Sequence, residues 1–374
     1  MAEQKKSRFG TALVLGGCGY LGCHIIEALH SDGSFASIVG ASRNPRRWRI
    51  AEAVYKNCDI ADGTQIQELL DEIEPEVVFH SVAPNANESD EVQYRVNYAS
   101  TKQLLEIARH HAAVRAVIYT GSARSIASDS QTRSTPLTED IAILHNLSST
   151  GVAYERTKGA ADALTLAMNT PDTRDSSLRG FEGVLLTTVI RVPALYGRRD
   201  FRTSARILKR TNTRGTIVQL GDNKAKHEWL YFDNAAHAHV LAAKALLDQH
   251  SRPLNARVDG EAFFITDGAP VKFWDFLRKL WAAAGDTRCT DPTKIKQVPM
   301  GLAILVATVV EWALWIFTLG KKKTNLSAAQ LNYINRGSWW SIEKARERLG
   351  YEPICSTDEG VRRTVEWFQH NKNE

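Results

Sequence analysis

The sequence has few cysteines and no pattern that would use them together. Its five cysteines are Cys18, Cys23, Cys58, Cys289 and Cys355. They are scattered and odd in number, and they form neither a CxxC pair nor a Cys/His spacing typical of zinc ligands. The sequence therefore predicts no metal site and no disulfide framework, and a reducing compartment fits best.

A strong charge bias, a signal core, internal repeats and low-complexity linkers are also missing. Lys and Arg number 47 against 42 Asp and Glu, a net charge of +5 over 374 residues, and no nucleic-acid-binding motif accompanies the basic side chains. The first residues, MAEQKKSRFG, are polar. We expect no nucleic-acid partner and no secretory signal. The 43% hydrophobic content is typical of a globular protein.

Short apolar runs alternate with helical patterns from Thr11 to about Val192. The runs are TALVLG, SIVGAS, VVFHSVA, AVIYTGS and LLTTVIRV. Strands that are apolar on both faces and separated by helices predict an α/β fold with a doubly wound parallel sheet of the Rossmann type. The composition changes after about Gly197, which predicts one domain over 8–197 and a smaller C-terminal lobe over 198–374.

The first run leads into a glycine-rich turn. Gly16, Gly19 and Gly22 stand directly after a predicted strand and directly before a predicted helix. Such a turn allows a close approach of the backbone to a pyrophosphate, and the helix N-terminus attracts the anion. This context favours dinucleotide binding over an ordinary turn, so 8–197 is the expected NAD(P)-binding domain.

The second predicted strand ends at Ser42 and Arg43. A site that prefers NAD usually has an acidic residue here, whereas a neutral residue beside arginine suits the 2′-phosphate of NADP. Arg46, Arg47 and Arg49 follow closely. We predict NADP as the cofactor, with NAD as the alternative. A solvated basic loop is the competing interpretation.

Tyr154 and Lys158 form a YxxxK pair whose side chains share one helix face. A free tyrosine has a pKa of about 10, and a nearby ammonium group lowers it toward the range useful for a general base. Ser122 ends an earlier predicted strand, at the sheet edge that faces the ligand in this fold. Its hydroxyl could bond the reacting oxygen.

The ordered set GGCGYLG, CDI, HSVA, VNYAST, YTGSA, YERTK and RVPALYG resembles an extended short-chain dehydrogenase/reductase. The later stretches YFDNAAHAHVLAA, FFITDGAPVKFWDF and IEKARERLGYEP resemble the 3β-hydroxysteroid dehydrogenase family, especially its fungal sterol-4α-carboxylate 3-dehydrogenase (decarboxylating) branch. The resemblance implies that Tyr154 is the general acid/base and that Ser122 orients the substrate oxygen. It also implies that Lys158 lowers the pKa of Tyr154 and holds the nicotinamide ribose. It further implies a cofactor site formed by Gly16, Gly19, Tyr20, Leu21, Gly22, Asp59, Ile60, Asn97 and Pro193.

Three positions depart from the family pattern. Leu15 replaces the usual threonine before the first glycine of the turn. Ser42 replaces the usual acid, which puts NAD specificity in doubt. Gly121 replaces the usual hydroxyl residue before the catalytic serine, a loss that could alter substrate positioning.

The resemblance implies that the protein interconverts a 3β-hydroxyl and a 3-ketone by hydride transfer. The substrate would be a sterol or a polycyclic terpenoid of the meroterpenoid type, and decarboxylation at C4 could follow. Two other functions stay open from the sequence. One is a soluble NADPH-dependent ketone reductase of the same superfamily, and the other is a non-catalytic regulator that senses NADP.

Residues 300–319 form a long apolar run with one charge, Glu311, followed by Lys321, Lys322 and Lys323. A helix at the membrane interface or a core helix of the lobe fits better than a spanning helix, because a glutamate in lipid is costly. We expect the cytoplasmic face of the endoplasmic reticulum or another membrane surface, with the cytoplasm as the alternative. A homodimer is a further expectation.

Overall fold

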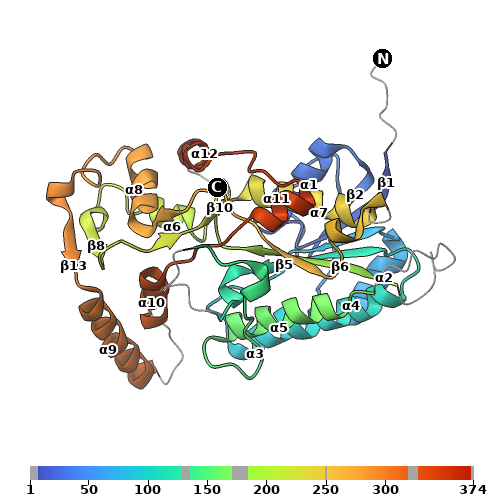
Figure 1. The fold of residues 1–374 in the computed structure, drawn as a ribbon, viewed down its shortest axis with the longest axis horizontal. Helices are drawn as coiled ribbons and strands as arrows, with labels where there is room; N and C mark the ends of the chain where they lie inside the picture. Colours follow the sequence, from blue (N-terminus) through green and yellow to red (C-terminus); the bar gives the residue numbers. More distant parts are fainter. Residues whose placement is uncertain (1–6, 128–134, 171–183, 249–250, 319–326, 372–374) are drawn as a thin grey trace, which may run out of the picture.

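The computed structural model describes residues 7–127, 135–170, 184–248, 251–318 and 327–371 (Figure 1). Within these residues, a seven-stranded parallel sheet has the order β11-β6-β5-β4-β1-β2-β3. Its strands are β1 (Phe9–Leu15), β2 (Phe35–Ser42), β3 (Val54–Asn57), β4 (Val77–His80), β5 (Ala116–Ser122), β6 (Leu186–Val192) and β11 (Glu261–Phe264). The predicted doubly wound sheet is confirmed.

Helices cover both faces of this sheet. The covering helices are α1 (Gly22–Asp32), α2 (Gly63–Ile73), α3 (Asp90–Gln93), α4 (Ser100–His110), α5 (Ala153–Ala167) and α7 (Phe232–Leu247), and Figure 1 shows α1 and α7 on the face opposite to α4 and α5. Strand β1 shows why the four residues from Ala12 to Leu15 are all apolar. Ala12 and Val14 pack in the cluster that includes α1 and α7, whereas Leu13 and Leu15 pack in the one that includes α2 and α4.

The strand order reverses between β1 and β4. The chain continues from β1 to β2 on one side of this point and from β4 to β5 on the other. In such sheets the ligand binds in the crevice outside the carboxyl ends of the strands, at the reversal. The sheet therefore brings the loop after β1 and the end of β5 to the same edge.

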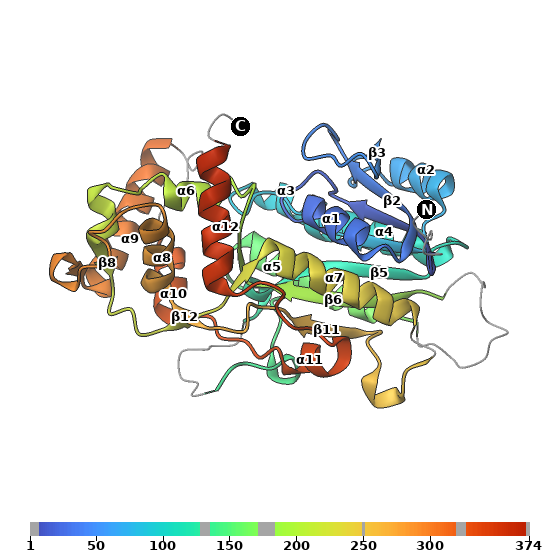
Figure 2. The ribbon, with the colours of Figure 1, turned by 90° about the horizontal axis from the view of Figure 1, so that it is seen from above.

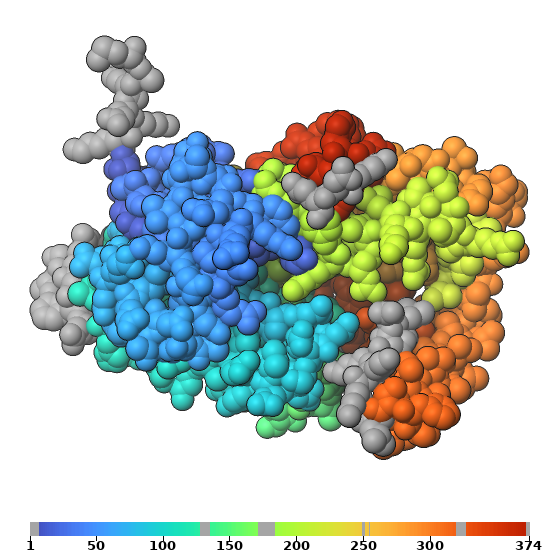
Figure 3. Space-filling model, turned by 180° about the vertical axis from the view of Figure 1, so that it is seen from behind, coloured from blue at the N-terminus to red at the C-terminus, as the bar shows by residue number. Residues whose placement is uncertain are grey.

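The C-terminal lobe lies at the end of the molecule opposite β3, and in the space-filling view it meets the sheet domain along a hollow (Figures 2 and 3). Its elements are β7 (Ala194–Tyr196), α6 (Ser204–Leu208), β8 (Val218–Leu220), β9 (Lys226–His227), β10 (Trp229–Tyr231), β12 (Val271–Lys272), α8 (Phe273–Ala283), β13 (Lys296–Val298), α9 (Met300–Thr318), α10 (Ala328–Arg336) and α12 (Thr357–His370). Trp229 and Phe276 stack at 3.8 Å between ring centroids in its aromatic core.

Segments beyond residue 197 also return to the sheet. Strand β11 pairs with β6 at the sheet edge, α7 packs on α1, β5 and β6, and α11 (Glu343–Leu349) packs on α7 and β11. Part of the segment 198–374, which was expected as a separate lobe, thus packs on the sheet of the expected domain over 8–197. The physical reason is that β6 and β5 need a further strand and helix to bury their apolar faces, and the chain supplies these from its second half.

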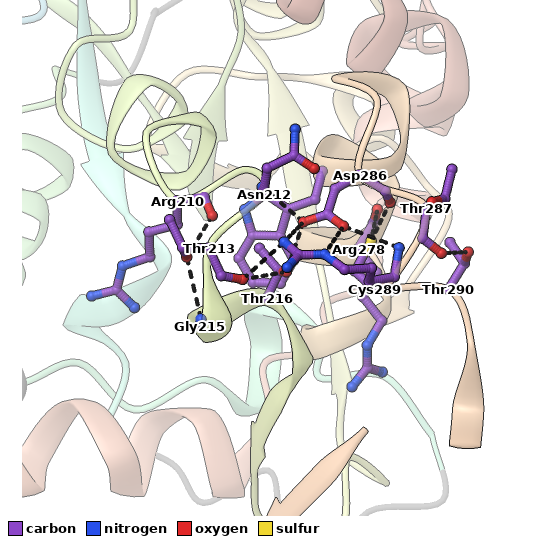
Figure 4. A network of polar contacts seen from close by, with 12 residues as sticks. Arg210, Asn212, Thr213, Gly215, Thr216, Arg278, Asp286, Thr287, Cys289 and Thr290 are labelled. Carbon is purple, nitrogen blue, oxygen red and sulfur yellow. Dashed lines mark hydrogen bonds and ion pairs between the residues drawn. The ribbon is translucent and has the colours of Figure 1, made fainter. Parts of the chain in front are cut away.

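A polar network holds the lobe together around Asp286 (Figure 4). Its carboxylate is fully buried and accepts hydrogen bonds from the backbone N–H of Asn212 (2.8 Å), from the hydroxyl of Thr216 (2.7 Å) and from Arg288. Burial opposes the charge, but hydrogen bonds from Arg288, Thr216 and Asn212 outweigh it and hold the pKa of Asp286 below its usual range. The loop after α6 is thereby tied to the loop after α8.

We expect Asp286→Asn to lower the free energy of unfolding by roughly 2–3 kcal/mol, because buried donors lose a charged acceptor. Denaturant unfolding of the full chain measures this. A carboxylate with a lowered pKa stabilises the fold above about pH 4, so the difference from the unsubstituted protein should shrink below that pH. The control is Asp222→Asn, whose side chain is 52% exposed. An equal loss in both variants would contradict the role of the network.

Candidate active site

The glycine-rich turn between β1 and α1 has the geometry of a phosphate cradle. Gly16 has φ +85°, a conformation that favours glycine. A Cβ on Gly22 would lie 2.0 Å from the carbonyl oxygen of Gly16, so no side chain fits there. Leu21, which precedes α1, makes no side-chain cap, and this leaves first-turn N–H groups for an anion. These residues and Gly19 and Tyr20 beside them fit a dinucleotide.

One further glycine of this turn was missed by the sequence analysis. A Cβ on Gly17 would lie 2.7 Å from Cα of Gly40 on β2, so the turn packs directly on the neighbouring strand. The adjacent GG pair in the sequence was the available signal. Leu15, the departure before the first glycine, is buried in the sheet core.

Ser42 and Arg43 lie where β2 ends, beside the turn. The Ser42 hydroxyl accepts a hydrogen bond from the backbone N–H of Cys18 at 3.0 Å. Arg43, Arg46 and Arg47 are exposed and form no ion pair with any described residue. This edge therefore presents positive charge and no carboxylate at the end of β2.

Other predicted cofactor residues also follow strand ends. Asp59 comes after β3, and its carboxylate accepts the N–H of Ala61 at 3.1 Å. Ile60 is buried in the core beside it. Pro193 is buried between β6 and β7. All three positions therefore lie toward the carboxyl edge of the parallel sheet.

The three predicted catalytic residues lie on β5 and α5, which pack together. Ser122 ends β5, is 5% exposed, and its hydroxyl accepts the backbone N–H of Arg124 at 3.3 Å. Tyr154 is the second residue of α5 and is partly exposed, and Lys158 lies one turn later. The structure thus places a hydroxyl, a phenol and an ammonium group in neighbouring elements at the ligand-binding edge.

Lys158 is buried, and its nearest groups belong to β5. The Nζ atom donates to the carbonyl oxygen of Thr120 at 2.6 Å and lies 4.1 Å from the centroid of the Tyr119 ring. Desolvation by burial lowers the pKa of Lys158 to about 7, although the charge of Asp162 opposes this. The amine is therefore held in contact with the strand that carries Ser122.

Asn97 lies in a π-helical turn, Tyr94–Ala99, just before α4. Its Nδ2 donates to Gln93 Oε1 at 2.8 Å and to Thr157 Oγ1 at 3.1 Å. Thr157 stands between Tyr154 and Lys158, so this contact fixes the helix that carries both. The Oδ1 atom of Asn97 is buried and has no partner among the described residues, which leaves an acceptor open in the site.

The structure explains why glycine precedes Ser122. A Cβ on Gly121 would lie 2.7 Å from Cγ1 of Val189 and 3.1 Å from Oδ2 of Asp162. Asp162 is occupied by a buried bidentate ion pair with Arg191, at 2.8 and 2.9 Å. The ion pair between α5 and β6 therefore fills the space that a hydroxyl side chain would need.

A small cleft, with room for about one water molecule, is lined by residues that follow Ser122 and Tyr154 in the sequence, and the sequence analysis missed most of its lining. Its lining is Ala123, Arg124, Ile126, Glu155, Tyr333, Arg336, Gly337 and Trp340, and we call it the α10 cleft. Arg124 pairs with Glu155 at 2.7 Å and lies 5.7 Å from the ring centroid of Tyr154. Sequence proximity to Ser122 and Tyr154 could have indicated these two residues. No local signal connects them with α10, which lies about 180 residues later.

Histidines in these elements have structural partners. His80 is buried and bonds Thr101, and His239 is buried between Thr120 and the carbonyl of Ala235. Burial lowers the pKa of His239 to about 4. In the part of the chain that the structure describes, no group of three or more His, Cys, Asp or Glu residues is arranged to hold a metal ion.

Some solved structures with the same fold are those of sugar-nucleotide enzymes. UDP-glucose 4-epimerase of Thermotoga maritima, with UDP-glucose, superposes with a TM-score of 0.67 at 19% identity, covering 97% of this chain and 100% of that one. UDP-glucuronic acid 4-epimerase of Bacillus cereus, in complex with NAD, gives 0.67 at 17% identity, covering 96% and 99%. At these identities the likeness concerns the fold alone.

Sequence relatives are more specific. The chain is 31% identical over 311 residues to a decarboxylating sterol-4-alpha-carboxylate 3-dehydrogenase of Gibberella zeae, covering 82% of this chain and 96% of the relative. It is 28% identical over 377 residues to 3beta-hydroxysteroid-dehydrogenase/decarboxylase isoform 1 of Arabidopsis thaliana, covering 96% and 80%.

The profile of the 3-beta hydroxysteroid dehydrogenase/isomerase family matches residues 13–295, from β1 to the segment before β13. This span contains the glycine-rich turn, Ser122, Tyr154 and Lys158. The resemblance inferred from the sequence motifs is confirmed. The chain belongs to the 3-beta hydroxysteroid dehydrogenase/isomerase family, and it is an NAD(P)-dependent oxidoreductase that acts on CH–OH groups.

Proposed function

We propose that the protein interconverts a 3β-hydroxyl and a 3-ketone on a sterol or a polycyclic terpenoid. The observation that carries this proposal is the position of Ser122, Tyr154 and Lys158 on β5 and α5, at the sheet edge that also holds the phosphate cradle. The names of the sequence relatives support a sterol-like substrate.

Each side chain has a distinct role in this reaction. Ser122 donates a hydrogen bond to the substrate oxygen, and Tyr154 removes the hydroxyl proton during oxidation or returns it during reduction. Lys158 supplies positive charge one helical turn from Tyr154, and the contact between Asn97 and Thr157 holds that turn in place. When bound, the nicotinamide accepts or supplies the hydride.

Loss of CO2 follows from the chemistry of the product when the substrate carries a carboxyl group at C4. That carboxyl is β to the new ketone, so the C–C bond breaks and its electron pair passes into the carbonyl as an enolate. Protonation of the enolate carbon then gives the ketone. This step needs no catalytic group beyond the ketone itself. The relative from Gibberella zeae is named as decarboxylating, which supports the loss of CO2.

We expect Tyr154→Phe to lower turnover by roughly 10²–10⁴-fold, because the general acid/base is lost. The absorbance change of the nicotinamide with a panel of 3β-hydroxysteroids measures turnover, and binding of NADP should be retained. Tyr94→Phe is the matched control, since Tyr94 is 48% exposed. Near-normal turnover of Tyr154→Phe would sink the assignment, and cofactor binding by the unsubstituted protein without turnover of any steroid in the panel would contradict the proposed substrate class.

We propose NADP as the preferred cofactor, since Ser42 is neutral and Arg43 follows it. Ser42→Asp should shift the ratio of kcat/KM values toward NAD by roughly tenfold or more, because a carboxylate repels the 2′-phosphate. Aspartate can still accept the N–H of Cys18, so the turn should keep its shape. Ser31→Asp adds the same charge at an exposed position of α1. An unchanged NADP preference in Ser42→Asp would refute the argument.

We further propose that α9 binds a membrane interface, on the cytoplasmic face of the endoplasmic reticulum or another membrane. Its large apolar side chains face outward, with Trp312 63% and Phe317 86% exposed, and this differs from a core helix of the lobe. By length and composition α9 could also cross a bilayer. Its carboxylate, Glu311, accepts the backbone N–H of Ala328 at 3.3 Å, so this charge is engaged with α10. That contact favours the interface over a spanning helix.

We expect the full chain to sediment with vesicles of phosphatidylcholine and phosphatidylserine and to be released by alkaline carbonate. Replacement of Leu305, Val309 and Phe317 by serine should remove most of this binding, because buried apolar area drives it. The control replaces Ile143 and Ile354, which are 66% and 60% exposed, by serine. Retention in carbonate would indicate a spanning helix, and equal binding by both variants would contradict α9 as the anchor.

A further inference from the structure

Arg124 contacts both of the hydroxyl-bearing residues of the candidate site. It lies in a short helical turn, Ala123–Ser125, which follows Ser122 and packs on α5. Its backbone N–H donates to the Ser122 hydroxyl at 3.3 Å, and its Cζ atom lies 5.7 Å from the ring centroid of Tyr154. A guanidinium within about 6 Å of a ring centroid attracts the ring electrostatically. One residue therefore connects the end of β5 to the first turn of α5.

A carboxylate and a second ring fix the guanidinium of Arg124 in this place. Its NH2 group donates to Glu155 Oε1 at 2.7 Å, and Glu155 is the residue after Tyr154 on α5. The ring centroid of Tyr333 on α10 lies 5.8 Å from Cζ of Arg124. The Tyr333 hydroxyl in turn donates to Ser338 Oγ at 3.1 Å. The guanidinium thus joins a ring of α5 to a ring of α10, and the lobe supports its position beside Tyr154.

Lys158, the other cation of the site, is directed at different groups. Its Nζ atom donates to the carbonyl oxygen of Thr120 at 2.6 Å and lies 4.1 Å from the ring centroid of Tyr119, and both of these residues belong to β5. A guanidinium does not deprotonate in proteins, so the charge of Arg124 is permanent. The site therefore has a second and permanent positive charge, which lies against the ring of Tyr154.

The charge of Arg124 is coupled to its neighbours. Burial by itself lowers the pKa of Arg124, but the negative charge of Glu155 and those of the ionised phenols of Tyr154 and Tyr333 outweigh burial and raise it. Coupling between two groups is reciprocal, so the guanidinium in turn favours the phenolate of Tyr154. Contact geometry and charge thus indicate the same partner for Arg124.

We propose that Arg124 is a positioning residue for the reaction, which holds the Tyr154 ring and the Ser122 hydroxyl in place and favours the ionised phenol. This rests on the proposed function, in which Tyr154 is the general acid/base. The backbone N–H of Arg124 binds the Ser122 oxygen and leaves the hydroxyl hydrogen for the substrate. The guanidinium favours the form of Tyr154 that removes a proton during oxidation.

The first test removes the charge of Arg124 and keeps a long side chain. In Arg124→Met, kcat for oxidation of a 3β-hydroxysteroid should fall roughly tenfold with KM for NADP little changed, because the phenolate is less favoured. The acid limb of the pH profile of kcat should move to higher pH by about half a unit or more. Arg124→Lys keeps a positive charge and should restore part of both. Retained binding of NADP shows that each variant is folded.

Arg156→Met is the matched control for the loss of charge. Arg156 lies on the same helix as Tyr154, but its guanidinium pairs with Asp90 at 3.1 Å. This variant should keep the kcat and the pH profile of the unsubstituted protein. Equal effects of Arg156→Met and Arg124→Met would contradict a specific role of Arg124.

A second measurement does not depend on turnover. NMR of protein labelled at the tyrosine Cζ atoms follows the ionisation of Tyr154, whose signal is identified by its loss in Tyr154→Phe. This signal should titrate at a higher pH in Arg124→Met than in the unsubstituted protein. Both proteins contain the same other titratable groups around this pair, namely Glu155, Lys158, Tyr119 and Tyr333.

Two results would overturn the proposal. One is equal titration of Tyr154 with and without the guanidinium, and the other is an equal loss of kcat in Arg124→Met and Arg124→Lys, which would indicate a structural role. If the steroid is still oxidised by the unsubstituted protein, the proposed function stands in either case. A shifted titration without turnover of any steroid supports the role of Arg124 and contradicts the proposed substrate class instead.

Discussion

The hydrogen bond from the ammonium of Lys158 to the carbonyl of Thr120 joins the two elements on which the site depends. It fixes α5, which carries Tyr154, to β5, which ends in Ser122. Burying an ammonium is costly, and the lowered pKa of Lys158 reports that cost. The ion pair between Asp162 and Arg191 and the contact between Asn97 and Thr157 hold the same helix from two other sides. The fold thus keeps Lys158 buried between α5 and β5 in spite of the desolvation cost, and the proposed reaction takes place beside it.

The lobe places residues that are distant in the sequence beside the elements that carry Ser122 and Tyr154. The α10 cleft joins residues next to Ser122 and Tyr154 with residues of α10 and the segment after it. Within the lobe, an aromatic cluster and the buried carboxylate of Asp286 hold the elements together. Because α7 and β11 return to the sheet, the chain crosses between the two parts more than once. The lobe is therefore tethered at several points, and α10 is held against the catalytic edge.

Helix α9 consists almost entirely of apolar residues, yet most of its large side chains are exposed. Its apolar side chains are exposed to solvent in the isolated chain, which is unfavourable unless another phase covers them. The contact of Glu311 with the start of α10 links this helix to the wall of the cleft. An apolar substrate that dissolves in a bilayer would meet the protein near this end. In the proposed function, α9 and α10 would connect membrane binding with substrate access.

The sequence by itself determined the sheet, the glycine-rich turn and the order of Ser122, Tyr154 and Lys158. These depend on local patterns: the alternation of strand and helix, the conformational freedom of Gly16, and the helical spacing of four residues. The sequence did not indicate that β11 and α7 pack with the first domain, because pairing between strands far apart in the chain produces no local sequence pattern. It also gave no reason for Gly121, which the space filled by Asp162 and Val189 explains. Only the tertiary structure brought Tyr333 beside Arg124, since long-range packing alone decides which distant side chains share a cleft.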